Sequence, residues 1–189
     1  RSDGTTLVVR ESARAVRDEA GNVVYYEGTV EDVTDRKRAE DALRESEERY
    51  RTLAENAQEY IFIINRESRV QYLNAAAEKV LGQSRDTVIG IRIKDIFPPG
   101  VADRLGDNIR SVLESGQPRA VQDEIAFRGR KVWLDTHLIP LRTSKGAISG
   151  ILGVSRDVTE SVENEAALRE SEERYRTLAE SAQEHIFII

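Results

Sequence analysis

A segment of 23 residues occurs twice in this chain of 189 residues, and the repeat constrains the fold more than any other feature. Residues 167–189 repeat residues 42–64 with two changes, Asn56 to Ser181 and Tyr60 to His185. The same offset of 125 residues aligns 32–35 with 157–160 without a gap. A fixed period of this length predicts a tandem array, of which the chain holds one whole copy and parts of two others.

The first part of the chain has the pattern of a β-hairpin. Residues 5–16 alternate between polar and apolar side chains, 18–22 are rich in turn formers, and 23–33 are rich in β-branched and aromatic residues. We therefore interpret 1–35 as the last two strands of a preceding copy. By the same period, 183–189 would be the first strand of a following copy.

Helical periodicity begins at Arg36 and predicts linker helices over 36–57 and 161–182. Small and apolar residues in the first helix follow one another at spacings of four and three, forming a candidate dimer seam of Ala39, Leu43, Ser46, Tyr50, Leu53 and Ala57. Because half of these positions are Ala or Ser, the seam alone would be weak. We expect a homodimeric coiled coil supported by the flanking domains; the alternative is a single amphipathic helix lying on its own domain.

Residues 58–160 form the complete copy. Asn74 is suited to cap a helix start and Gly82 to end that helix. The periodicities predict, in order, strands at 60–64 and 70–73, helices at 75–81, 84–90 and 101–113, and strands at 120–127, 131–141 and 147–158. This order predicts an α+β domain with an antiparallel sheet.

Several stretches of this copy together form a recognisable pattern, namely 50–57, 72–78 with 81–82, Trp133 with Pro140, and 153–160. With this pattern the copy resembles a PAS domain with its C-terminal PAC portion. The resemblance implies a five-stranded antiparallel sheet with helices on one face, flanked here by long linker helices. In this family such modules sense small molecules, light or redox state, or only mediate dimerisation, commonly in front of a histidine kinase or cyclic-dinucleotide enzyme.

One face of the predicted strand 131–141 is more apolar than the other and is formed by Val132, Leu134, Thr136 and Leu138. We expect this face to line the interior. The candidate ligand pocket is then walled by Phe97, Leu105, Ile109, Val121, Ile125, Leu134, Thr136 and Leu138; the alternative is that these residues form a packed core. Thr136 corresponds to Glu11 in the preceding copy, so the two copies are not expected to hold the same molecule.

The opposite face of this strand carries Trp133, Asp135 and His137. No second histidine and no cysteine lies nearby in the sequence, so we expect an interface and no metal site. His185 takes the place of Tyr60 in the repeat and should lie on a strand. Neither histidine is expected to be a phosphoacceptor.

Residues Asp157, Val158, Thr159 and Glu160 stand where the last strand passes into the second linker helix. An acidic side chain there can accept backbone N–H bonds at the helix start, and Thr159 can cap the helix. The family resemblance assigns this junction to signal transfer. A plain capping turn is the alternative interpretation.

The composition limits the cofactors and the chemistry. The chain has no cysteine, which excludes cysteine-linked flavin and thioester-linked chromophores. Haem is disfavoured because 101–113 contains no His, Cys, Met or Tyr. A non-covalent flavin, a carboxylate metabolite, a fatty acid or no ligand at all stay open. We find no nucleophile with a base, no phosphate-binding glycine loop and no metal cluster, so a catalytic domain is expected only outside this segment.

A net charge of −6 without a basic cluster argues against nucleic acid or an anionic membrane as a partner. No apolar run approaches the roughly 18 residues of a membrane span, so we expect a cytoplasmic module, whether or not its parent protein is membrane-anchored. The expected function is a sensory and dimerisation module that relays a conformational signal through coiled-coil helices to an output domain. The alternative is a ligand-free structural spacer.

Overall fold

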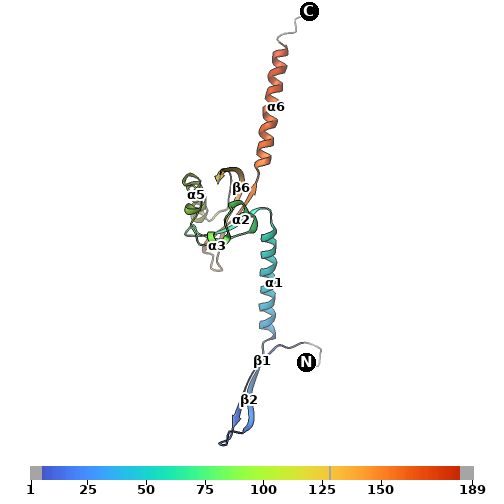
Figure 1. Ribbon diagram of the computed structural model, residues 1–189, viewed down its shortest axis with the longest axis vertical. Helices are drawn as coiled ribbons and strands as arrows, with labels where there is room; N and C mark the ends of the chain where they lie inside the picture. Colours follow the sequence, from blue (N-terminus) through green and yellow to red (C-terminus); the bar gives the residue numbers. More distant parts are fainter. Residues whose placement is uncertain (1–5, 128, 184–189) are drawn as a thin grey trace, which may run out of the picture. The chain divides into compact units, whose positions relative to one another are not determined.

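A computed structural model describes residues 6–127 and 129–183, in two units, one up to Leu53 and one from Ala54 onward. The first unit contains an antiparallel hairpin of β1 (Val9–Arg17) and β2 (Val23–Asp32), followed by α1 (Thr34–Asn56), whose last three residues belong to the second unit (Figure 1). The helix begins two residues before the predicted start, because Asp32 accepts a hydrogen bond from the Thr34 amide and fixes the first turn there.

The second unit is built on a five-stranded antiparallel sheet with the strand order β4-β3-β7-β6-β5. The strands are β3 (Tyr60–Asn65), β4 (Val70–Leu73), β5 (Arg119–Phe127), β6 (Arg130–Arg142) and β7 (Ile148–Asp157). Thus β3, which follows α1, pairs with β7, which precedes the second long helix. The sheet confirms the predicted fold class.

Four described helices lie between β4 and β5 in the chain: α2 (Ala75–Leu81), α3 (Arg85–Val88), α4 (Ile93–Ile96) and α5 (Pro99–Ser115). The Asn74 side chain accepts from the Ala77 amide at the start of α2, and Gly82 closes that helix in the left-handed conformation with φ 59°. Ser84 caps α3 in the same way as Asn74. The one-turn helix α4 was not predicted; its buried Ile93 donates its amide to the Ser68 carbonyl.

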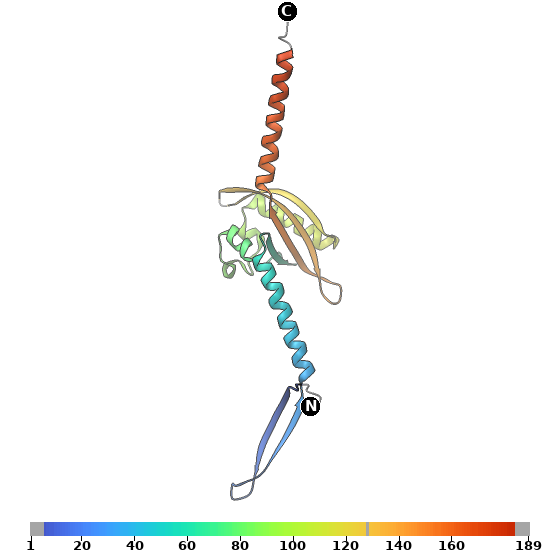
Figure 2. The same ribbon diagram turned by 90° about the vertical axis from the view of Figure 1, so that its right-hand side faces the viewer.

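One apolar layer holds the helices against one face of the sheet. Its fully buried members include Ile64, Leu73, Val112 and Ile151, from both the sheet and α5. Figure 2 shows α5, in yellow-green, lying against the strands. On β6, Val132, Thr136 and Leu138 are buried whereas His137 and Ile139 are exposed, which confirms the predicted inner face.

The chain leaves the sheet through α6 (Thr159–Gln183), slightly longer than the predicted 161–182. The predicted strand of a following copy, 183–189, falls on Gln183 at the end of α6 and on residues 184–189, which lie outside the described residues, as does His185. Within the described parts of the chain, no helix is both long and apolar enough to cross a bilayer.

Candidate functional site

A cavity of about 130 Å³ lies between the inner face of the sheet and helices α2, α4 and α5. All eight residues predicted to wall a pocket line it: Phe97, Leu105, Ile109, Val121, Ile125, Leu134, Thr136 and Leu138. Their role in binding a ligand stays a prediction. The space is close to that of an engineered apolar cavity of about 150 Å³ that takes up benzene. It has room for one small organic molecule.

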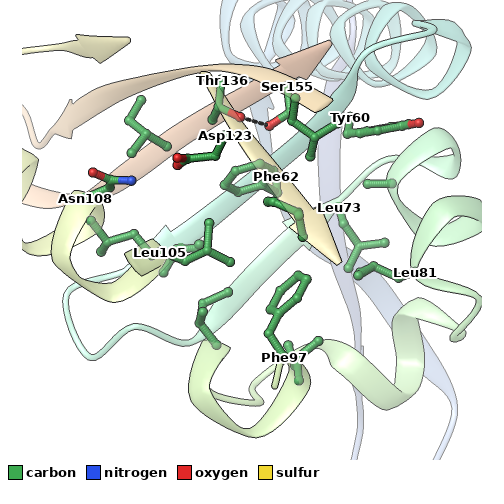
Figure 3. Close-up of a pocket in the computed structure, with 18 of the residues that line it drawn as sticks. Tyr60, Phe62, Leu73, Leu81, Phe97, Leu105, Asn108, Asp123, Thr136 and Ser155 are labelled. Carbon is green, nitrogen blue, oxygen red and sulfur yellow. Dashed lines mark hydrogen bonds between the residues drawn. The ribbon is translucent and has the colours of Figure 1, made fainter. Parts of the chain in front are cut away.

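Several further residues that line the cavity precede Phe97 and were not among the eight predicted from the sequence. The first two strands and α2 contribute Tyr60, Phe62, Leu73 and Leu81 (Figure 3). The alternation of β3 places Tyr60, Phe62 and Ile64 on one side, and this signal could have found them. The Phe62 ring lies over Gly153 on β7, where a side chain would collide with it.

The cavity has a small polar region. The hydroxyls of Thr136 and Ser155, both buried and directly opposite each other on β6 and β7, lie 2.7 Å apart and form a hydrogen bond. Figure 3 shows the Asp123 carboxylate and the Asn108 amide pointing toward one another at the cavity's edge. Among the described residues, neither Asp123 nor Asn108 has a side-chain hydrogen bond or ion pair. Asp123 was not among the residues predicted to line the cavity, although it alternates with Val121 and Ile125 on β5.

The predicted junction forms a compact hydrogen-bond network at the start of α6. Asp157 Oδ1 accepts from the Thr159 amide at 3.0 Å and from the Thr159 hydroxyl at 2.6 Å. The Thr159 hydroxyl oxygen in turn accepts from the amide of Trp133 on β6 at 2.9 Å, and the Val158 amide donates to the Trp133 carbonyl. The predicted hydrogen bond from an amide at the helix start to Asp157 is confirmed, whereas the assignment of this junction to signal transfer stays a prediction. The prediction for Thr159 is wrong, because its oxygen binds the neighbouring strand and not an amide of its own helix.

The same network occurs in the first unit. Asp32 Oδ1 accepts from the amide and the hydroxyl of Thr34 at 3.0 and 2.6 Å, and the Val8 amide donates to the Thr34 hydroxyl at 2.9 Å. Val8, Asp32 and Thr34 stand 125 positions before Trp133, Asp157 and Thr159. The local sequence therefore specifies this geometry. Glu160, the last residue of the predicted junction, is exposed.

One member of the cavity also reaches the junction. The Tyr60 hydroxyl donates to Asp157 Oδ2 at 3.5 Å, and Tyr60 lies directly opposite Ser155 on β7. Ser155 lines the cavity two residues before Asp157. Tyr60 therefore connects the wall of the cavity to the carboxylate that binds Thr159, the first residue of α6.

An ion-pair network that the sequence did not predict joins the last turn of α1 to α2 and α3. The Arg85 guanidinium donates to both Glu55 oxygens at 3.0 Å, and its Nε donates to Glu78 at 3.0 Å. Glu55 also accepts from the Tyr72 hydroxyl and the Ala75 amide. The hydrogen bonds from Arg85 hold the pKa of the Glu55 carboxyl below its ordinary value. No local pattern marks residues 30 positions apart as partners.

Asn74 completes this attachment. It is fully buried, and its Oδ1 accepts from the amides of Ile61 and Ala77 while its Nδ2 donates to the carbonyls of Ala54 and Glu59. Its amide therefore binds four backbone groups from three segments of the chain, which ties the end of α1 and β3 to the start of α2. The sequence predicted only the bond to α2.

The candidate dimer seam lies largely in the open. Leu43, Tyr50 and Leu53 on α1 are each at least 61% exposed, and their counterparts Leu168, Tyr175 and Leu178 on α6 at least 58%. Of the other seam positions, Ala39 is exposed, Ser46 is partly buried, and Ala57 follows the last residue of α1. Pairing through the seam stays a prediction.

The outer face of β6 carries Trp133, Asp135 and His137 as predicted. His137 is exposed, with its Nε2 3.7 Å from Asp135 Oδ1. Across the described residues, no three His, Cys, Asp or Glu side chains gather as metal ligands.

Comparison with known proteins gives consistent results. Residues 54–163, more than half of the chain, match the family model described as PAS fold. The methanogenesis regulatory histidine kinase FilI of Methanothrix harundinacea is 30% identical over 61% of this chain and 13% of its own length. The probable diguanylate cyclase DgcE of Escherichia coli is 27% identical over 82% of this chain and 15% of its own. The chain thus spans a small part of these signalling proteins.

Among solved structures, the PAS domain of Bordetella pertussis BvgS superposes with a TM-score of 0.55 at 25% identity, covering 69% of this chain and 98% of that domain. The family match over 54–163 and the five-stranded antiparallel sheet of this chain lead to the same assignment. The chain belongs to the PAS domain family.

Proposed function

We propose that the second unit is a sensory module that binds a small molecule in its cavity and passes the resulting change to α6. The observation that carries the proposal is the position of Tyr60, which lines the cavity and donates to Asp157 at the junction. Asp157 and Thr159 then connect β7 and β6 to the first residue of α6. A ligand that displaces Tyr60 or Ser155 would alter the support of that first turn.

The tandem arrangement is part of this proposal. The pairing of β1 with β2 has the register of β6 with β7 at an offset of 125 residues: Ala13 lies opposite Gly28 as Leu138 lies opposite Gly153. The register shift between Val16 and Arg17 likewise recurs between Leu141 and Arg142. This agreement supports the assignment of 1–35 to a preceding PAS copy and of 58–160 to a complete copy. The repeated sequence supports the assignment of 183–189 to the start of a third.

The proposed output runs through paired helices. Both long helices expose the same apolar positions at heptad spacing, which supports a homodimer with α1 and α6 in parallel coiled coils. The relatives include a histidine kinase and a probable diguanylate cyclase, which supports an output domain of one of these kinds in the parent protein. The segment itself would then act as a sensor and not as an enzyme.

The first test is native mass spectrometry of the purified chain, followed by denaturing extraction of any retained molecule. We expect a small molecule at one per chain. A protein without added mass, whose stability is also unchanged by small apolar molecules, would contradict the sensor and favour the ligand-free spacer.

The second test separates binding from relay. Replacing Asp157 and Thr159 together by Ala should leave the domain folded and able to bind, while the ligand no longer changes hydrogen exchange in the first turns of α6. Tyr60→Phe, which removes one hydroxyl, should weaken the same response. Tyr26→Phe removes an exposed hydroxyl of the hairpin and serves as the control. An unchanged response in the double variant would overturn the relay.

A further inference from the structure

The charge of the cavity wall restricts what the cavity can hold. Among the described residues that line it, Asp123 alone has a formal charge at neutral pH, and none is Lys, Arg or His. Asp123 lies on the inner face of β5 between Val121 and Ile125 and opposite Leu134. An anionic ligand would therefore meet a carboxylate of its own sign without a compensating cation.

The Asp123 carboxylate can accept a hydrogen bond from a ligand. The side chain is partly buried, and no other group in the described structure donates to it. A carboxylate removed from water is stabilised when a donor, above all a cation, replaces the lost hydration. The nearby Asn108 amide supplies both a donor and an acceptor for a second hydrogen bond.

The rest of the wall requires an apolar body. Phe97, Leu105, Ile109 and Leu138 are among the hydrophobic side chains that surround the space of about 130 Å³. The hydroxyls of Thr136 and Ser155 bind each other and leave a single hydroxyl proton for a ligand. A molecule of this size can thus fill the apolar part and still place one polar group beside Asp123.

We propose that the cavity selects small apolar amines, with the protonated amine received by the Asp123 carboxylate. The inference rests on the proposed sensory function and specifies its ligand class. It argues against two ligand classes that the sequence left open, a carboxylate metabolite and a fatty acid. The ionised carboxylate of either ligand would be repelled by Asp123 and has no proton to donate to it. Asp123 acts as the residue that determines specificity.

Four probes of similar shape test the inference on the whole chain: benzylamine, benzyl alcohol, toluene and benzoate, each titrated by calorimetry and by ligand-dependent thermal unfolding. We expect benzylamine to bind about ten-fold more tightly than toluene, since a hydrogen bond between charged groups contributes on this scale. Benzyl alcohol should lie between them, and benzoate should bind more weakly than all three.

Asp123→Asn keeps the shape and removes the charge. In this variant, benzylamine should fall to the level of toluene, while toluene itself binds with an affinity within about two-fold of the original, which shows that the cavity is intact. Asp103→Asn makes the same change on an exposed position of α5 outside the cavity and should alter none of the four affinities.

The outcomes separate this inference from the proposed function. Binding of toluene without preference for benzylamine, or a preference that survives Asp123→Asn, would overturn the inference and leave the sensory cavity standing. Benzoate binding as tightly as benzylamine would do the same. Failure of all four probes, toluene included, would overturn both.

Discussion

The hairpin β1–β2 with its junction and the pair β6–β7 with its junction are two versions of one structure in opposite surroundings. Their strand registers agree at an offset of 125 residues, and Thr34 and Thr159 make the same hydrogen bonds to Asp32 and Asp157. Yet every residue of β2 is exposed, whereas β7 contains the fully buried Ile151. Tyr26, which corresponds to Ile151 in the repeat, is 74% exposed.

This difference separates what the local sequence determines from what the rest of the domain supplies. The hairpin turn, the register and the Asp-to-Thr hydrogen bonds form in a unit that contains neither the other strands nor the covering helices. Burial of the inner face, and with it the cavity, occurs only where β3 and α5 complete the layer. The Asp-to-Thr junction therefore forms in the first unit without the cavity that accompanies it in the second.

The largest effect is expected from shortening the same repeat position in both versions. Ile151→Ala leaves a cavity in the core of the second unit and should lower its free energy of unfolding by about 2–5 kcal/mol. Tyr26→Ala removes an exposed side chain and should change stability by no more than about 0.5 kcal/mol. Urea unfolding followed by far-UV circular dichroism, and by fluorescence of Trp133, the single tryptophan, measures both.

A large loss of unfolding free energy in Tyr26→Ala would contradict the contrast between the exposed hairpin and the buried strand β7. It would show that the hairpin is packed against another surface in solution, such as a strand or helix of a second molecule. Repeating the measurement over a hundred-fold range of protein concentration distinguishes this case, because only intermolecular packing makes the cost depend on concentration.

A second matched pair lies on the helices. The Glu55 side chain on α1 binds Arg85, Tyr72 and Ala75, whereas the side chain of Glu180, its repeat counterpart on α6, is exposed and has no hydrogen-bond partner in the described structure. Glu55→Ala should destabilise the second unit by about 2 kcal/mol, since it removes charge-assisted hydrogen bonds. Glu180→Ala should have an effect within about 0.5 kcal/mol. Equal costs in urea unfolding would show that the network around Arg85 contributes nothing specific.

The sequence predicted what depends on neighbours along the chain. The cap at Asn74, the end at Gly82, the strand 70–73 and the inner face of β6 followed from spacing and residue type. The one-turn α4, the bond of Thr159 to Trp133 and the Glu55–Arg85 pair did not, because each depends on which segments the fold brings together. Asp123 was not predicted for another reason: a carboxylate between Val121 and Ile125 interrupts the apolar alternation that marks an inner face.

The smallest expected effect is a pH dependence of stability that distinguishes Glu55 from Glu180. Arg85 lowers the pKa of Glu55 in the folded state, so the stabilisation from the ionised pair is complete above the ordinary glutamate pKa of about 4.3. It is lost as the pH falls through the lowered folded-state pKa, because the unfolded chain then binds the proton first. The free-energy difference between the original chain and Glu55→Gln should therefore be largest near pH 6 and shrink below pH of about 4.

Thermal or urea unfolding of both proteins between pH 3 and 7 measures this slope. Glu180→Gln changes the net charge by the same amount and controls for the general effect of charge on acid stability. A difference for Glu55→Gln that stays constant across the range would mean that Arg85 does not bind the ionised carboxylate preferentially. In that case the link between the last turn of α1 and α3 would depend on the hydrogen bonds from Tyr72 and Ala75, which a neutral glutamine oxygen also accepts.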